Sequence, residues 1–105
     1  MIRMGEIDFK SIDVQEARKM IGHGNVTVID IRDAASYNEA HIENAILVND
    51  DNIEKFLKEA DKNKPLICYC YYGNNSQGAA RFFRQEGFKE VYNIQGGFEK
   101  YREIL

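Results

Sequence analysis

Cys70 stands at the end of an apolar run and directly before small and polar residues, in the segment LICYCYYGNNSQGAARFF that covers residues 66–83. Gly73 tolerates backbone angles that a side chain forbids, and the two asparagines after it accept the left-handed region better than most residues do. A loop of this kind can turn successive N–H groups inward and form a concave nest for an anion. The spacing therefore predicts a sulfur nucleophile held in an anion-binding cup.

A helix is expected directly after this loop, over residues 76–87, with Ser76 as its N-cap and Gly87 at its C-terminal end. The free N–H groups of its first turn and the positive end of its dipole would then face Cys70. Both effects stabilise a thiolate over a thiol, and such a placement lowers the pKa of a cysteine. On the residues alone, Cys70 is predicted to carry out cysteine chemistry on an anionic ligand.

The chain has two cysteines, Cys68 and Cys70, and we expect different roles for them. Cys68 lies inside the predicted strand, where a lone cysteine is more often a small buried hydrophobe than a nucleophile. The two share a face of that strand with α-carbons roughly 6.5–7 Å apart, beyond the usual disulfide geometry. Neither a Cys-x-x-Cys pair nor a four-ligand cysteine and histidine set occurs, so we expect free thiols in a reducing compartment and no metal site.

Short apolar runs alternate with amphipathic segments, which predicts an α/β domain with a mostly parallel sheet covered by helices on both faces. The expected strands are residues 9–13, 26–31, 45–48, 65–70 and 90–94. The expected helices are residues 11–21, capped by Ser11 or Asp13, and residues 33–41, 50–62, 76–87 and 97–105. In such sheets, sites form beyond the carboxyl ends of the strands. Asp30 and Cys70 both stand at such ends, on strands that could be neighbours.

Composition narrows the class of protein. With 105 residues, 44% of them hydrophobic, residues 1–105 are expected to form one domain. Charged residues make up 30% of the chain with a formal net charge of −3, which argues against a nucleic-acid partner. The N-terminal decapeptide lacks the apolar region of a secretory signal, and no run approaches the roughly 18–20 apolar residues of a membrane span. We therefore expect a soluble, cytoplasmic protein with no membrane partner.

The loop CYYGNNS at residues 70–76 resembles the active-site loop of the rhodanese family of sulfurtransferases. It is most similar to that of small single-domain thiosulfate sulfurtransferases of the GlpE type, which carry a Cys-Tyr-x-Gly-Asn-x-Ser loop. Three further segments match in the family's order: VIDIRD at residues 28–33, Y…AHIENAI at 37–46 and YNIQGGFEKY at 92–101. Together the four segments span most of the chain.

This resemblance implies a rhodanese-like fold with a central parallel five-stranded sheet, and it implies that Cys70 is the catalytic sulfur carrier. Asp30 and Arg32 match the family's Asp-x-Arg pair and would form a structural network near the site. The reaction implied is ping-pong transfer of sulfane sulfur from thiosulfate, through a Cys70 persulfide, to cyanide, a thiol or a dithiol. No metal or organic cofactor is implied, and the acceptor could be a thiol protein. The substrate-binding loop would consist of Tyr71, Tyr72, Gly73, Asn74, Asn75 and Ser76.

Two other functions fit parts of the same pattern. Phosphatases with a rhodanese-like fold use a similar cradle, but they need an arginine six residues after the cysteine to grip phosphoryl oxygens, and that position is Ser76 here. A persulfide carrier or binding module that serves a partner protein would keep the cysteine, as this chain does. The sequence disfavours the phosphatase and leaves the carrier open.

Other residues that could carry chemistry are given structural interpretations. His41 is expected to be a hydrogen-bonding residue and not a general base, because a preformed thiolate needs none. Arg81 and Arg84 fall on the polar side of the predicted helix over residues 76–87 and are expected on a solvated face. Tyr71 and Tyr72 could wall the pocket, with Tyr72 nearer its mouth.

Overall fold

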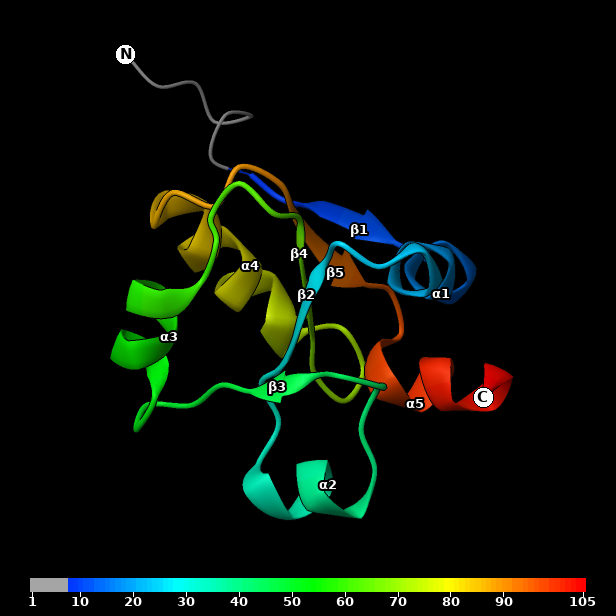
Figure 1. The fold of residues 1–105 in the computed structure, drawn as a ribbon. Helices are drawn as coiled ribbons and strands as arrows, with labels where there is room; N and C mark the ends of the chain where they lie inside the picture. The colour runs from blue at the N-terminus through cyan, green and yellow to red at the C-terminus, as the bar shows by residue number, and fades with distance from the viewer. Residues whose placement is uncertain (1–7) are drawn as a thin grey trace.

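Five parallel strands form the central sheet of the computed structural model, which describes residues 8–105. Their spatial order is β1-β5-β4-β2-β3 (Figure 1). The strands are β1 (Lys10–Ile12), β2 (Thr27–Asp30), β3 (Ile46–Leu47), β4 (Leu66–Tyr69) and β5 (Val91–Ile94). All four neighbouring pairs run parallel, which confirms the predicted α/β architecture.

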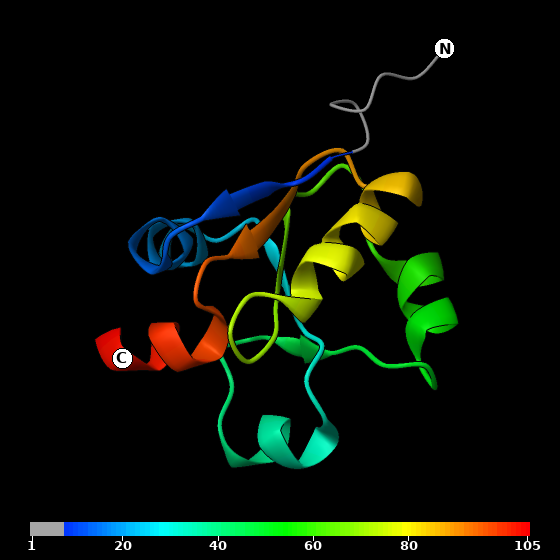
Figure 2. The same ribbon diagram turned by 180° about the vertical axis from the view of Figure 1, so that it is seen from behind.

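Helices cover both faces of this sheet (Figures 1 and 2). The helices are α1 (Val14–His23), α2 (Ala34–Glu39), α3 (Ile53–Glu59), α4 (Asn75–Gln85) and α5 (Gly97–Tyr101), and a 3₁₀ turn (Arg102–Ile104) follows α5. α3 and α4 pack on one face, α1 and α5 pack on the other, and α2 lies in the connection between β2 and β3. Within residues 8–105, no helix has the length and apolar composition needed to cross a bilayer.

The central position of β4 explains why its sequence is apolar without alternation. Leu66 and Cys68 pack into the core beneath α3 and α4, whereas Ile67 and Tyr69 pack into the core beneath α1 and α5. A strand that is buried on both faces reads as a continuous apolar run. Cys70 is the first residue after this strand, so it lies at the carboxyl edge of the sheet.

β2 and β4 are hydrogen-bonded neighbours, with Asp30 opposite Tyr69. The expected adjacency of the strands that end near Asp30 and Cys70 is therefore confirmed. Of the two caps considered for α1, Asp13 takes the position, since its carboxylate accepts from the Glu16 N–H at 2.8 Å.

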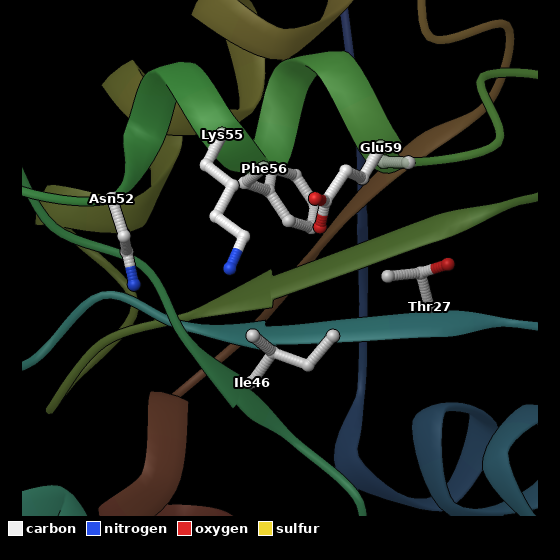
Figure 3. A pocket seen from close by; sticks show the side chains of 7 residues that line it. Thr27, Ile46, Asn52, Lys55, Phe56 and Glu59 are labelled. Carbon is white, nitrogen blue, oxygen red and sulfur yellow. The ribbon is translucent and has the colours of Figure 1, made fainter.

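The N-terminal end of α3 is tied to the outer edge of the sheet at β3. Asn52 Nδ2 donates to the carbonyl oxygen of Leu47 at 2.7 Å. Beside this contact lies a surface hollow of about 400 Å³, lined in part by Ile46, Lys55 and Phe56 (Figure 3). Its lining includes no residue of the loop after β4, so this hollow is separate from the surroundings of Cys70.

Candidate active site

Three hydrogen-bonding groups converge on the sulfur of Cys70. The backbone N–H groups of Gly73 and Ser76 donate to Sγ at 3.2 and 3.3 Å. The hydroxyl of Ser76 lies 3.2 Å from the same sulfur. Cys70 is only 3% exposed, so these contacts form in a site from which most water is excluded. The arrangement is a small cup that can hold a sulfur anion.

The cup shifts the protonation of Cys70 toward the thiolate. Burial by itself raises the pKa of the thiol, but the Ser76 side chain beside the sulfur and the hydrogen bonds from the N–H groups of Ser76 and Gly73 outweigh it, and the pKa falls below its ordinary value. Hydrogen bonds to the charged form favour that form. A cysteine with a lowered pKa carries more thiolate at neutral pH, which is the nucleophilic species.

Cys68, two residues earlier, is in the opposite situation. It is completely buried, and its sulfur lies 3.5 and 3.6 Å from the carbonyl oxygens of Ser76 and Tyr92. Burial raises the pKa of Cys68 far above its ordinary value, and the neighbouring Cys70 raises it further. Both cysteines are free thiols, but only Cys70 has an environment suited to a nucleophile.

Gly73 is required at its position by both backbone angle and space. Its φ is +89°, and a Cβ there would lie 2.8 Å from the carbonyl oxygen of Ile94 and 3.0 Å from the nitrogen of Gly96. Those neighbours are backbone atoms that cannot swing aside. The tight turn at Gly73 is what directs its N–H toward Cys70.

The start of α5 holds the same loop from the other side (Figures 1 and 2). The N–H groups of Phe98 and Glu99 donate to the carbonyl oxygens of Cys70 and Tyr71 at 2.9 and 3.0 Å. The free N–H groups at the start of a helix need such acceptors. A segment more than twenty residues away in sequence thus orients the carbonyl side of the loop, and leaves its N–H side free to face the sulfur.

Known proteins resemble this chain over most of its length. The family model for the rhodanese-like domain matches residues 13–104. The chain belongs to the rhodanese-like domain family. The thiosulfate sulfurtransferases GlpE of Shewanella oneidensis and Coxiella burnetii are each 38% identical to it, over 90% of this chain and over 94% and 88% of their own lengths. A rhodanese-like domain protein from Staphylococcus aureus has the same fold, with a TM-score of 0.77 at 24% identity over 89% of this chain and 91% of that one.

The expected loop residues of this rhodanese-like domain do not all reach the sulfur. Gly73 and Ser76 contact it directly, while Asn74 and Asn75 are exposed at the start of α4. Tyr72 is 68% exposed beside the cup. The phenol of Tyr71 hydrogen-bonds to the Asp33 carboxylate, and lies 3.1 Å from the Ser36 hydroxyl.

The expectation that Ser76 caps the helix is wrong. α4 begins at Asn75 with Asn74 at the cap position, and no side chain supplies a capping hydrogen bond. Ser76 lies inside the first turn, completely buried, with its N–H donating to the Cys70 sulfur and its hydroxyl oxygen 3.2 Å from that sulfur. α4 starts at Asn75, one residue before its expected start, and its first turn lies against the Cys70 sulfur. The Ser76 N–H donates to the sulfur, and the Gln77 N–H donates to the Asn74 carbonyl at 3.3 Å.

Asp30 and Arg32 form the structural network that the family resemblance implies. Their side chains make a buried bidentate pair, with Nη2 to Oδ2 at 2.7 Å. Arg32 Nη2 also donates to the Ala40 carbonyl at 2.6 Å, and the Tyr69 hydroxyl donates to Asp30 Oδ2 at 2.7 Å. The guanidinium sits 4.2 Å from the ring centre of Phe98, so this network supports the start of α5 behind the loop.

His41 and the two arginines of α4 lie outside the cup. The His41 ring stacks on Tyr37 with centroids 3.9 Å apart, and its Nδ1 lies 2.7 Å from the carbonyl of that residue, as a structural role requires. Arg81 is exposed and pairs with Asp8. The expectation of a solvated face is wrong for Arg84, which is partly buried and donates to backbone carbonyls, including that of Phe88 at 2.7 Å. Its length lets it reach the chain reversal after α4.

Sequence reasoning from the loop itself missed three residues that shape the site. Gln77 Nε2 donates to the Gly73 carbonyl at 2.9 Å, Asn93 contacts both Ser76 and that carbonyl, and Gly97 packs against the loop backbone. The paired glycines in the segment YNIQGGFEKY were a usable signal, because adjacent glycines often mark a close backbone approach. Nothing local to Asn93 points to Cys70.

Substituting Gly97 by alanine should destabilise the domain by about 1–3 kcal/mol and slow alkylation of Cys70. Gly97 has φ +60°, and a Cβ there would lie 2.5 Å from the Tyr71 carbonyl oxygen and 2.7 Å from that of Cys70. The loop must therefore move. Urea unfolding and the rate of reaction with iodoacetamide measure the two effects.

Gly22→Ala is the matched control for this substitution. Gly22 lies in α1, where an added Cβ meets nothing within 4 Å. It should be neutral or stabilising by up to about 1 kcal/mol and should leave the reactivity of Cys70 unchanged. Equal effects of the two substitutions would show that Gly97 does not hold the loop.

Proposed function

We propose that this protein is a thiosulfate sulfurtransferase in which Cys70 carries the sulfur. The observation that supports this most directly is the pair of hydrogen bonds from the backbone N–H groups of Gly73 and Ser76 to the Cys70 sulfur, which suits a thiolate and then a persulfide anion. The GlpE relatives at 38% identity are named for the same activity.

The first half-reaction loads the cysteine. The Cys70 thiolate attacks the outer sulfur of thiosulfate, a new S–S bond forms, and the S–S bond of thiosulfate breaks with its electron pair leaving on sulfite. The product is a Cys70 persulfide anion. Donors fixed before the reaction stabilise such a charge without reorganising. The N–H groups of Gly73 and Ser76 are the groups that would serve the terminal sulfur.

The second half-reaction transfers the sulfur from the Cys70 persulfide to an acceptor. A nucleophilic acceptor attacks the terminal sulfur of the persulfide, and the Cys70 thiolate leaves with the electron pair of the S–S bond. Cyanide would give thiocyanate, and a thiol would give a new persulfide. A lowered cysteine pKa makes Cys70 a better leaving group. A protein thiol or a small dithiol would approach the sulfur past the side chain of Tyr72, which is 68% exposed beside the cup.

A phosphatase is a poor alternative on this geometry. The position six residues after Cys70 is Ser76, which is completely buried and already bonded within the cup. A phosphoryl dianion would meet amide dipoles there and no bidentate guanidinium.

Incubation with thiosulfate, followed by cyanide, tests the proposal on the native protein. Release of sulfite and repeated formation of thiocyanate support the enzyme. Stoichiometric loading of one sulfur per chain with no transfer to cyanide, but transfer to a protein thiol, supports a persulfide carrier in its place. Absence of both loading and turnover overturns the proposed function.

A further inference from the structure

Asn93 is a buried polar side chain that contacts two residues of the Cys70 cup, Gly73 and Ser76. It sits on β5 directly opposite Cys68 of β4 and is 1% exposed. Its Nδ2 donates to the Gly73 carbonyl and to the Ser11 hydroxyl, each at 3.3 Å. Its Oδ1 accepts from the hydroxyl of Ser76.

The orientation of this amide is fixed by its neighbours. A carbonyl can only accept, so the Gly73 oxygen requires the nitrogen of Asn93 on its side. The oxygen of Asn93 must then face Ser76. Because a buried amide oxygen needs a donor, and Ser76 supplies it, the single hydroxyl hydrogen of Ser76 is directed to Asn93 and away from Cys70.

These contacts close a ring of hydrogen bonds around the thiol form of Cys70. The thiol donates to Ser76 Oγ at 3.2 Å, Ser76 donates to Asn93, Asn93 donates to the Gly73 carbonyl, and the Gly73 N–H donates back to the sulfur. When Cys70 loses its proton, the Ser76 hydroxyl can turn to the thiolate only by leaving Asn93 Oδ1 without this donor. Asn93 and the thiolate therefore compete for one hydrogen.

We propose that Asn93 is a positioning residue for Cys70, which holds the hydroxyl hydrogen of Ser76 and so limits how strongly the cup favours the thiolate. The inference rests on the proposed function, since it concerns the same nucleophile. Limiting this stabilisation matters chemically, because a more stabilised thiolate is present in a larger fraction but is less nucleophilic. Asn93 keeps the sulfur from being stabilised beyond the range where it reacts well.

A double-mutant cycle on Cys70 alkylation tests the inference. The pH dependence of the reaction with iodoacetamide is measured for the native protein, Asn93→Val, Ser76→Ala and the double variant, with Cys70→Ser as the blank. Valine is close to asparagine in size, suits a strand and cannot accept a hydrogen bond. Asn93→Ala replaces it in the same cycle if the valine variant does not fold.

With Ser76 present, Asn93→Val should move the midpoint of the pH profile downward by about 0.5–1 unit, because the hydroxyl is freed for the thiolate. In the Ser76→Ala background it should give no downward shift. The proposal is overturned if there is no downward shift with Ser76 present, or if the shift is the same in both backgrounds. Alkylation needs no thiosulfate, so failure of sulfur transfer would leave this result standing, and the two proposals fail separately.

Discussion

Replacing Cys70 by serine should abolish the loading of sulfur from thiosulfate, whereas Cys68→Ala should still load one sulfur per chain. A serine hydroxyl remains protonated at neutral pH and is a weak nucleophile, so none of the contacts in the cup can rescue the reaction. Cys68 is completely buried against the Ser76 and Tyr92 carbonyls, and burial raises its pKa, so it takes no part. Intact-mass measurement after incubation with thiosulfate, together with sulfite release, reports the outcome.

Comparing these two substitutions separates the loss of the nucleophile from the loss of a buried thiol that only packs in the core. Both remove a thiol, at positions two residues apart in the sequence, but only one removes the sulfur that Gly73 and Ser76 contact. Sulfur loading that survives in Cys70→Ser, or is lost in Cys68→Ala, would mean that the nucleophile has been misassigned.

Replacing Asp30 by alanine should lower the free energy of unfolding by about 3–5 kcal/mol, because it leaves the buried guanidinium of Arg32 without its partner. A domain of this kind is stable by only about 5–15 kcal/mol, so the loss is a large fraction of the total. Asp30 is completely buried and Arg32 is 6% exposed, and the carboxylate also accepts from the Tyr69 hydroxyl. The midpoint of urea unfolding measures the change.

The double variant Asp30→Ala/Arg32→Met is the control for this prediction. Removing both charges deletes the pair without leaving one of them buried alone, which costs less than removing a single partner. The double variant should therefore be more stable than Asp30→Ala. A single variant as stable as the native protein, or a double variant less stable than the single one, would show that the pair does not act as a buried unit.

Much of the fold follows from patterns that are local in the sequence. The apolar run of β4, buried on both faces, and the alternation of strands with amphipathic helices predict a parallel α/β sheet, and the structure confirms it. The placement of Cys70 at a strand end before a glycine turn is also local, because the carboxyl edge of a parallel sheet and the φ of Gly73 depend on a few adjacent residues.

The parts that could not be predicted depend on which strands are neighbours. β5 lies beside β4, and this brings Asn93 opposite Cys68 and the start of α5 against the loop. The paired glycines before α5 indicate a close backbone approach, but no local pattern says that the loop after β4 is what they approach, since this depends on the spatial order of the whole sheet. The contact of Ser76 with Asn93 could not be predicted for the same reason, because Asn93, which accepts from the Ser76 hydroxyl, lies on β5.

The sequence by itself thus determined the class of fold, the strand that ends at Cys70 and the loop able to hold an anion, because periodicity and backbone freedom are properties of adjacent residues. Only the tertiary structure decided how the cup is completed. Asn93 bonds to Ser76 and to the Gly73 carbonyl, and the N–H groups of Phe98 and Glu99 bond to the loop carbonyls of Cys70 and Tyr71. Only the packing of β5 and α5 against the loop brings these groups into place.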